Sequence, residues 1–323
     1  GNLEKASADL KLQLQILKNL GYFPLENANF HEYDLLIEGI FGVGLSREVG
    51  GIYKEMIERI NACGKPVIAI DIPSGISGDS GKVLGCAVHA AITVTFGSYK
   101  RGHLLYPGRE YCGNIKLVSI GFHNQTIKKY ATGYTLEADD HLMPERKAYS
   151  NKGSYGKVLM ITGSPGMAGA AFLSACAAYT VGAGLVQIYT ASENRLALQE
   201  LLPEAIISCY DSYDDSQLSH LLDWADVVCI GCGLGMGQIS EKILENVLKN
   251  VSCPCVIDAD GLNLLSRNIE LLNQCCAPVI LTPHMKEMSR LTGWSIDTIM
   301  EDRFQALDQI IKQSGPDTKS SII

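Results

Sequence analysis

The chain has 323 residues, of which 46% are hydrophobic, and a net charge of −8. This is enough apolar sequence for two domains of ordinary size, and the acidic balance excludes a general nucleic-acid-binding protein, which would carry a basic patch. The sequence has neither an apolar run of 18 residues nor a basic start followed by an apolar leader. It therefore predicts no membrane span and no signal peptide.

The eleven cysteines are spread along the chain, and most lie in apolar runs. The clusters Cys253-Pro-Cys255 and Cys275-Cys276 lack the two-residue spacing of a zinc-binding pair. We therefore expect reduced, mostly buried thiols in a cytoplasmic protein.

In the first part of the chain, short apolar runs alternate with helical patterns. The first helix is expected over 5–20, with Ser7 as its N-cap, and an apolar run follows at 33–38. A second predicted helix spans residues 49–62, and strands are expected at 66–70, 91–96 and 115–120. This alternation predicts a parallel sheet covered by helices.

Residues 124–151 are mostly polar and are the best candidate for a linker. A new alternation begins after them, with a helix of small residues at 168–181 and strands expected at 157–162, 185–190, 226–231, 254–260 and 278–283. The sequence therefore predicts two α/β domains in tandem.

In the first predicted domain, polar side chains follow successive strands. Glu38 and the pair Gly42-Val-Gly44 come after the first run, Asp71 and Ser74 after the second, and Lys100 after the third. Two carboxylates with hydroxyl and carbonyl oxygens at one edge suit a hard cation or the hydroxyls of a ribose. Lys100 could relay protons or hold a phosphate. An ordinary turn, a helix cap and a solvated lysine remain the plainer alternatives.

In the second predicted domain, four strands end in glycine, acid or histidine. Glycines follow the strands at 157–162 and 226–231, Asp258 and Asp260 end another, and His284 follows the last. The glycines match neither the dinucleotide fingerprint nor the lysine-bearing phosphate loop. Four such ends suggest one shared crevice.

These segments resemble a known family of two-domain enzymes. IEGIFGVGLSREVGG, AIDIPSGISGDSGKVLG and TVTFGSYKRGHLLYPGREYCG, within residues 33–122, resemble the epimerase half of the bifunctional NAD(P)HX repair enzymes. NKGSYGKVLMITGSPGMAGAA, WADVVCIGCGLG, VIDADGLNLL and ILTPHMKEMSRLTG, within 151–293, resemble the ADP- or ATP-dependent dehydratase half. NAD(P)HX is NADH or NADPH hydrated on the nicotinamide ring, in R and S forms.

The resemblance implies a Rossmann-like three-layer epimerase domain over 1–127 and a ribokinase-like dehydratase domain over 128–323. The first domain would interconvert R- and S-NAD(P)HX, and the second would dehydrate the S form at the expense of a nucleotide. The implied cofactors are K⁺ in the epimerase domain, and ADP or ATP with Mg²⁺ in the dehydratase domain. The implied partners are small molecules, with no nucleic acid and no membrane, and a homo-oligomer is left open.

The resemblance also implies which residues form the sites. Asp71 belongs to the epimerase substrate site, together with the loop Gly42, Val43, Gly44, Leu45, Ser46, Arg47 and Glu48. Ser74 helps to hold the potassium ion, with Glu38 where the family usually has Asp. We expect Asp71 and Lys100 to form an acid–base pair. In the dehydratase half the family's substrate contacts fall on Ala170, Gly233 and His284.

Two elements of the family are absent from the sequence: the NNGGDG-type loop of the epimerases and the late GSGD element of the dehydratases. We therefore expect a fragment cut at both ends. The alternatives are a ribokinase-like small-molecule kinase fused to a Rossmann-like domain, or a degenerate NAD(P)-metabolite-binding module.

Overall fold

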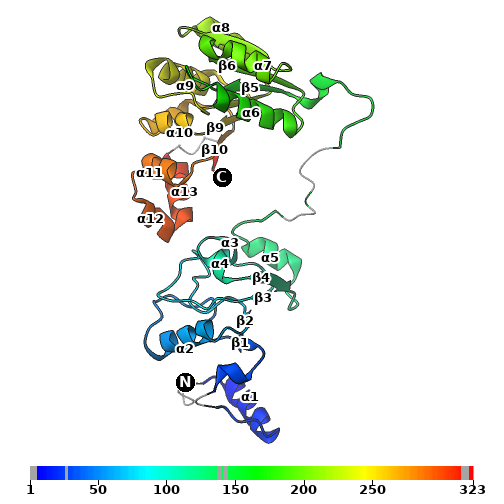
Figure 1. Ribbon diagram of the computed structural model, residues 1–323, viewed down its shortest axis with the longest axis vertical. Coiled ribbons are helices and arrows are strands. Elements are labelled where there is room, and N and C mark those ends of the chain that lie inside the picture. The colour runs from blue at the N-terminus through cyan, green and yellow to red at the C-terminus, as the bar shows by residue number, and fades with distance from the viewer. Residues whose placement is uncertain (1–5, 26–27, 137–139, 141–144, 314–319, 323) are drawn as a thin grey trace. The chain divides into compact units, whose positions relative to one another are not determined.

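The computed structural model describes residues 6–25, 28–136, 140, 145–313 and 320–322. The chain divides into two compact units, Gly1–Tyr134 and Thr135–Ile323, which we call the first and the second unit (Figure 1). Each unit contains a sheet in which all strand pairs are parallel. The predicted α/β class is therefore confirmed.

The first unit is built on four strands in the order β1-β2-β3-β4. Its strands are β1 (Leu36–Glu38), β2 (Val67–Ile70), β3 (Ile92–Phe96) and β4 (Asn114–Val118). Its α-helices are α1 (Ala8–Asn19), α2 (Gly51–Ala62), α3 (Arg101–Leu104), α4 (Gly108–Tyr111) and α5 (Asn124–Tyr130).

Helix α2 covers one face of this sheet because its apolar side chains recur at helical spacing. Ile57 and Ile60 of α2 are buried in one cluster with Val67 of β2. Helix α1 is capped by Ser7 as predicted, but none of its residues is buried.

The second unit is built on seven strands in the order β11-β10-β9-β8-β5-β6-β7. Its strands are β5 (Lys157–Ile161), β6 (Leu185–Ala191), β7 (Ile206–Tyr210), β8 (Val227–Ile230), β9 (Cys255–Ile257), β10 (Val279–Leu281) and β11 (Ser320–Ile322). Its α-helices are α6 (Ala168–Thr180), α7 (Arg195–Leu201), α8 (Asp215–Trp224), α9 (Gln238–Asn250), α10 (Asp260–Leu265), α11 (Met285–Thr292), α12 (Ile296–Glu301) and α13 (Arg303–Gln313).

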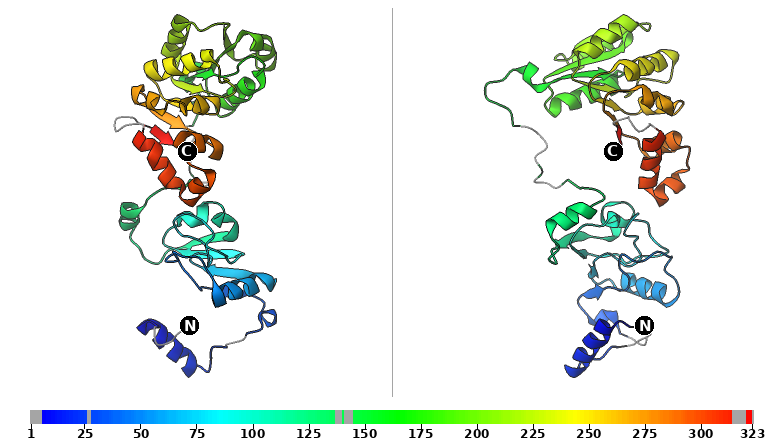
Figure 2. Two further views of the ribbon diagram at one scale, coloured as in Figure 1. Left: turned by 90° about the vertical axis from the view of Figure 1, so that its left-hand side faces the viewer. Right: turned by 180° about the vertical axis from the view of Figure 1, so that it is seen from behind.

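Two helical layers sandwich this sheet (Figure 2). Helices α6 and α7 pack on one face around Met160, whereas α8 and α9 pack on the other around Leu159. The chain runs outward from β5 through β6 to β7 and then returns to the other side of β5 with β8. The strand order therefore reverses between β5 and β8, which is where open α/β sheets bind ligands.

The structure contains elements that the sequence analysis did not predict. Strands β7 and β11 form the two edges of the second sheet, in segments that the predicted strands do not include. The expected linker over 124–151 begins with helix α5. No helix in the described ranges is both long and apolar enough to cross a membrane.

Candidate active sites

Glu38 and Ser74 meet at the carboxyl end of β1. Glu38 is the last residue of this strand, and its side chain is buried. Its Oε2 accepts a hydrogen bond from Ser74 Oγ at 2.6 Å, and its Oε1 accepts one from the Ser74 N–H at 2.9 Å. The Ser74 hydroxyl also lies 3.2 Å from the carbonyl oxygen of Phe41. Carboxylate, hydroxyl and carbonyl oxygens are thus gathered in one place.

The donor set of this site is chemically compatible with a hard cation, because such ions are held by oxygen atoms. In the described part of the chain, no basic side chain forms an ion pair with Glu38, whose carboxylate is instead bound by the Ser74 N–H and hydroxyl and by the Ile40 N–H at 3.3 Å. No cluster of three or more His, Cys, Asp or Glu that could hold a metal ion occurs among the described residues.

Asp71 follows β2 directly and forms an ion pair with Lys100. The Lys100 ammonium lies 2.5 Å from Asp71 Oδ1, and each side chain is about one-fifth exposed, at 21%. Thr95 Oγ1 and the Phe96 N–H also donate to Oδ1, at 3.0 and 3.3 Å. In the described part of the chain, every hydrogen bond to this carboxylate goes to Oδ1. Oδ2 is therefore left for a substrate group.

The surroundings of Asp71 favour its ionised form. Partial burial raises the pKa of the carboxyl, but the hydrogen bond and the charge of Lys100 lower it, as do Thr95 and the Phe96 N–H. The net result is a pKa below the ordinary value of an aspartic acid. Asp71 is therefore an ionised carboxylate at neutral pH.

Lys100 is held by three acceptors on neighbouring segments. Its ammonium donates to Asp71 Oδ1, to Thr95 Oγ1 at 2.9 Å and to the Phe96 carbonyl at 3.1 Å. The two oxygens other than Asp71 belong to the end of β3, so the lysine reaches back over the strand that precedes it. An ammonium fixed in this way is placed to donate a proton beside the free carboxylate oxygen.

A buried histidine that the sequence analysis did not select supports this pair. The imidazole of His103 is fully buried. Its Nδ1 accepts a hydrogen bond from the Lys100 N–H at 3.0 Å, and its Nε2 lies 2.8 Å from the Asp71 carbonyl oxygen. The only signal in the sequence is its position three residues after Lys100, at the start of a short helix.

The loop from Gly42 to Glu48 follows β1 at the same edge of the sheet. A Cβ placed on Gly42 or Gly44 would meet no atom within 4 Å, so the backbone here is open to a ligand. Leu45 packs into the core beneath, and Val43 is half-exposed. The loop also contains Ser46 and Arg47, and its end lies close to Gly85 through Glu48. The seven predicted residues therefore form one mostly exposed loop after β1, and their place in a substrate site stays a prediction.

In the second unit, the loops after β5 and β8 are bonded to each other at the point where the strand order reverses. The Gly163 N–H donates to the Cys232 carbonyl at 3.1 Å, and the Ser164 N–H donates to the Gly233 carbonyl at 2.6 Å. Asn194, which is buried, donates to the carbonyls of Gly163 and Ser164 at 2.9 Å each. Asn194 is a second residue that the sequence analysis missed, because its role depends on a contact between distant segments.

Two of the three predicted dehydratase contacts lie side by side. Gly233 has a left-handed φ of +62°, and a Cβ there would lie 2.7 Å from the Cβ of Ala170 and 3.2 Å from that of Met167. Only glycine fits this close approach between the loop and the first turn of α6. Gly233 and Ala170 therefore lie against each other where the loop after β8 meets the start of α6.

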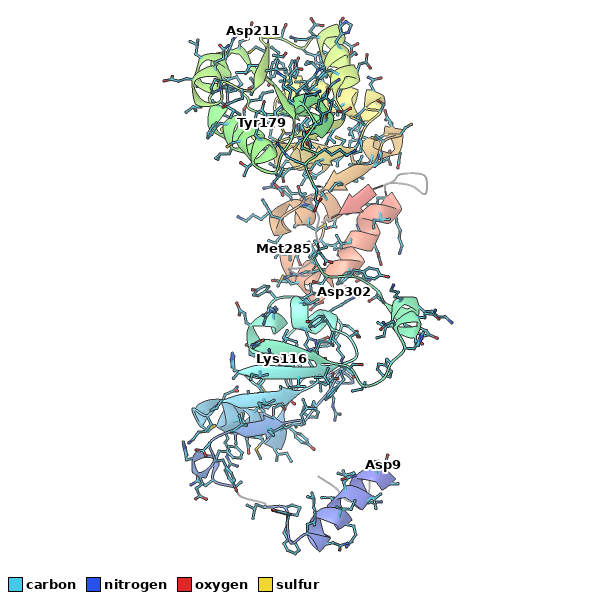
Figure 3. The ribbon with its side chains drawn as sticks, turned by 90° about the vertical axis from the view of Figure 1, so that its right-hand side faces the viewer. Asp9, Lys116, Tyr179, Asp211, Met285 and Asp302 are labelled. Atoms are coloured by element: carbon cyan, nitrogen blue, oxygen red, sulfur yellow. The ribbon has the colours of Figure 1, made fainter. Side chains whose placement is uncertain are left out.

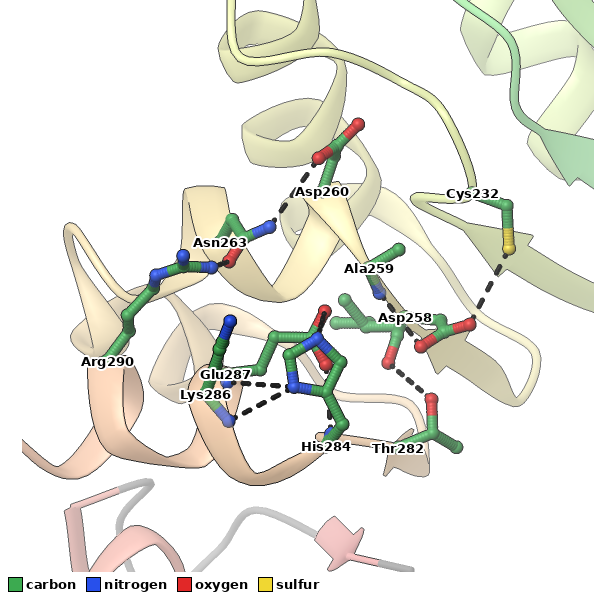
Figure 4. Close-up of polar contacts among 11 residues, drawn as sticks. Cys232, Asp258, Ala259, Asp260, Asn263, Thr282, His284, Lys286, Glu287 and Arg290 are labelled. Carbon is green, nitrogen blue, oxygen red and sulfur yellow. Dashed lines mark hydrogen bonds and ion pairs between the residues drawn. The ribbon is translucent and has the colours of Figure 1, made fainter. Parts of the chain in front are cut away.

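Acidic residues follow β9, the next strand of the sheet (Figure 4). Asp260 Oδ2 accepts a hydrogen bond from the Gly235 N–H at 2.8 Å, which ties the loop after β8 to α10. Asp258 Oδ1 accepts one from the Ala259 N–H at 2.8 Å, and its Oδ2 lies 3.7 Å from Cys232 Sγ. The acids therefore border the same loop as Gly233.

His284 follows β10 and caps helix α11. Its Nδ1 accepts hydrogen bonds from the N–H groups of Lys286 and Glu287, at 3.1 and 3.4 Å, and its side chain is 63% exposed. Its Nε2 lies 3.3 Å from Glu287 Oε1. The imidazole is accessible to a ligand, but among the described residues its polar contacts do not include Ala170 or Gly233.

The sequence analysis also missed a Cys-x-x-Cys pair at the end of β8. The Cys229 thiol donates a hydrogen bond that lowers the pKa of the Cys232 thiol, while partial burial and Asp258 act in the opposite direction. The net pKa of Cys232 lies below the ordinary value. All eleven cysteines lie in the described part of the chain and are free thiols.

Comparison with known proteins yields two family matches in tandem. Residues 1–102 match the family described as YjeF-related protein N-terminus, and residues 158–316 match the family described as NAD(P)H-hydrate dehydratase. A bifunctional NAD(P)H-hydrate repair enzyme of Coxiella burnetii is 38% identical over 295 residues, which are 90% of this chain and 59% of that protein. The enzyme of the same name from Thermofilum pendens is 34% identical over 283 residues, 85% of this chain and 54% of its own length.

Among solved structures, an ADP/ATP-dependent NAD(P)H-hydrate dehydratase from Bacillus subtilis, co-crystallised with ATP and Mg²⁺, is 28% identical. The match covers 56% of this chain and 61% of that one, with a TM-score of 0.46. This chain spans little more than half the length of the curated relatives named above. The two family matches lie in tandem, and the chain therefore carries a YjeF-related N-terminal domain followed by a domain of the NAD(P)H-hydrate dehydratase family.

Proposed function

We propose that this chain repairs NAD(P)HX, with the epimerase in residues 1–127 and the nucleotide-dependent dehydratase in residues 128–323. The observation that carries the epimerase half is the contact between Asp71 and Lys100 at the carboxyl end of β2, within a YjeF-related domain. The dehydratase half is supported by the hydrogen-bonded glycine loops after β5 and β8, within a domain of the dehydratase family.

Epimerisation of the hydrated ring needs one group that takes a proton and one that gives a proton. This holds whether the ring opens and closes again or water leaves and returns. In the ring-opening route, the Asp71 carboxylate, with Oδ2 free, is the base that accepts the proton of the substrate hydroxyl, while the bond from the hydroxyl carbon to the ring nitrogen breaks and a carbonyl forms. The Lys100 ammonium, 2.5 Å from the other oxygen, is the acid that gives a proton to this nitrogen. Both protons return when the nitrogen adds to the other face of the carbonyl and the other epimer forms.

A potassium ion would be held by the Glu38 carboxylate, the Ser74 hydroxyl and the Phe41 carbonyl. When bound, it supplies positive charge that can stabilise the substrate's polar groups. Glu38 reaches the Ser74 N–H and hydroxyl directly, so the carboxylate itself fixes the turn that follows Asp71. The loop from Gly42 to Glu48 would line the substrate beside it.

In the dehydratase half, the hydroxyl of S-NAD(P)HX becomes a good leaving group when it is phosphorylated by ATP or ADP. Phosphoryl transfer depends mainly on positioning and on charge stabilisation. Ala170 and Gly233 would contact the nicotinamide ring where the loop after β8 meets the start of α6, and His284 would contact it from the end of β10. Loss of phosphate, together with a proton from the neighbouring ring carbon, would then restore the double bond of NAD(P)H.

The test uses the full 323-residue chain with purified R- and S-NADHX. Epimerisation is followed by chromatography of the two forms, and dehydration by the return of NADH absorbance with and without ATP or ADP. We expect interconversion of the two forms without nucleotide. Nucleotide-dependent recovery of NADH from the S form is expected only from a protein that also contains the late GSGD element, which these 323 residues lack. An unchanged R to S ratio would refute the epimerase, and phosphate transfer to a hydroxymethyl substrate without NADH recovery would favour a kinase.

A further inference from the structure

The strongest observation outside the proposed acid–base pair is the buried imidazole of His103. Both of its ring nitrogens are used, one toward the Lys100 N–H at 3.0 Å and one toward the Asp71 carbonyl at 2.8 Å. A nitrogen that accepts from an N–H carries no proton, and one that contacts a carbonyl oxygen must carry one. The two contacts therefore require a neutral imidazole with its proton on Nε2.

The groups that His103 holds are main-chain atoms of the two residues proposed to move protons. Asp71 has a left-handed backbone with a φ of +68°, which is unfavourable for a residue with a Cβ. Its N–H donates to the Val94 carbonyl of β3 at 2.7 Å, and its own carbonyl is bound by His103. The unusual conformation is thus held on both sides, by β3 and by the imidazole.

Tight packing keeps the imidazole in this position. A Cβ at Gly102 would lie 2.2 Å from the Ser77 carbonyl, so the chain before His103 runs directly against the loop after β2. The Gly102 N–H donates to the Gly78 carbonyl at 2.8 Å. The start of helix α3 is therefore fixed to the same loop that Asp71 begins.

The charges around the imidazole are consistent with its neutral form. Burial is the largest influence and lowers the pKa of His103. The hydrogen bond to the Asp71 carbonyl and the Asp71 charge raise it, and Lys100 and Arg109 lower it further. The net pKa lies below the ordinary value, so at neutral pH the ring keeps one acceptor and one donor.

We propose that His103 is a positioning residue of the epimerase site, which locks the backbone of Asp71 and of Lys100 so that their side chains meet. This inference rests on the proposed function for its kinetic part. It predicts that substitutions can remove the two hydrogen bonds of the imidazole one at a time. In His103→Asn the amide oxygen keeps an acceptor near the Nδ1 position, whereas in His103→Gln the amide nitrogen keeps a donor near the Nε2 position.

The experiment measures epimerisation kinetics and the titration of the Asp71 carboxyl by ¹³C NMR, in the full chain and in both variants. We expect His103→Asn to lower kcat at least about ten-fold, with KM within about two-fold, because a displaced catalytic group costs rate more than binding. His103→Gln, which keeps the donor to Asp71, should lose less. In His103→Asn the titration midpoint of Asp71 should move up toward its ordinary value. The control is His89→Gln, because the His89 ring is exposed and stacks on Tyr111 with centroids 4.2 Å apart.

Folded variants that keep both kcat and the Asp71 midpoint would overturn the proposal and leave His103 as a core residue. If neither variant folds, ¹⁵N NMR of the unmodified chain decides: a proton on Nδ1, or a ring that titrates at its ordinary pKa, would also overturn it. If the unmodified chain does not epimerise NADHX, the proposed function fails, but the two NMR measurements still test whether His103 fixes Asp71.

Discussion

Replacement of Lys100 by methionine tests the proposed epimerase site most directly. Methionine keeps the apolar stem of the side chain and removes the three hydrogen bonds to Asp71, Thr95 and the Phe96 carbonyl. The Asp71 carboxylate keeps its bonds from Thr95 and from the Phe96 N–H. The change therefore removes the proposed acid without unravelling the surroundings of the base.

The magnitudes separate a catalytic role from a structural one. A hydrogen bond to a charged group contributes about 1.5–3 kcal/mol to stability, and because the pair is partly exposed we expect a loss of about 1–2 kcal/mol in the first unit. Removal of a general acid lowers rates about 10²–10⁴-fold, which corresponds to roughly 3–5 kcal/mol in activation free energy. The loss of rate should therefore exceed the loss of stability, with KM nearly unchanged.

The assay is the interconversion of R- and S-NADHX at saturating substrate. Stability of the first unit is followed by hydrogen exchange of the β2 and β3 amides, because both tryptophans, Trp224 and Trp294, lie in the second unit. The matched control is Lys116→Met, since Lys116 is exposed on β4 (Figure 3). A folded Lys100→Met variant with kcat within about two-fold of the unmodified chain would remove Lys100 from the mechanism and refute the reasoning.

The cation site, Gly233 and the buried histidine each give a further prediction. Epimerisation should be faster in potassium chloride than in choline chloride. Glu38→Gln or Ser74→Ala should abolish this difference in rate. Equal rates of the unmodified chain in the two salts would contradict the cation site. Gly233→Ala should destabilise the second unit by about 2 kcal/mol or more, because its Cβ would overlap a neighbour at a positive φ. Gly237→Ala, which has open space and a negative φ, should cost less than about 1 kcal/mol. Because the folded pKa of His103 is lowered, its contribution to stability is complete above the unfolded pKa of about 6.5 and is lost as the pH falls below it. Hydrogen exchange of the first unit between about pH 7 and pH 5 should show this loss, and a flat profile would contradict it.

The fold could be predicted where the sequence carries continuous apolar runs. KVLMI of β5 and LVQIYTA of β6 are almost entirely apolar because both faces of a parallel sheet are buried. Strand β7 lies at the sheet edge with most of its residues only partly buried, so its pattern is weak. Helix α5 buries no residue and therefore shows no apolar period. Edge strands and exposed helices bury few residues, so their sequences show no clear apolar pattern.

Site residues could be predicted where a charged side chain stands at or just after the end of a strand. Glu38, Asp71 and Lys100 each follow a strand of one parallel sheet, and the carboxyl ends of parallel strands lie at one edge. Their roles in binding and catalysis remain proposals. His103 and Asn194 could not be selected, because a buried polar side chain next to glycine-rich turns has many structural explanations. Their importance lies in contacts between segments distant in the sequence, which no local pattern encodes.

Backbone strain points to the same two places without reference to any relative. Among the described residues other than glycine, only Asp71 and Ala259 have a positive φ, at +68° and +47°. Such conformations cost roughly 1–3 kcal/mol each and persist only where the surroundings impose them. Asp71 directly follows β2, and Ala259 stands two residues after β9, between Asp258 and Asp260. In the first unit the positive φ turns the chain out of β2 directly after Ile70, and the Asp71 carboxylate meets the Lys100 ammonium. In the second unit the positive φ of Ala259 precedes Asp260, whose carboxylate binds the Gly235 N–H of the neighbouring loop. Each strained residue therefore lies where an acidic side chain connects the end of a strand to another segment.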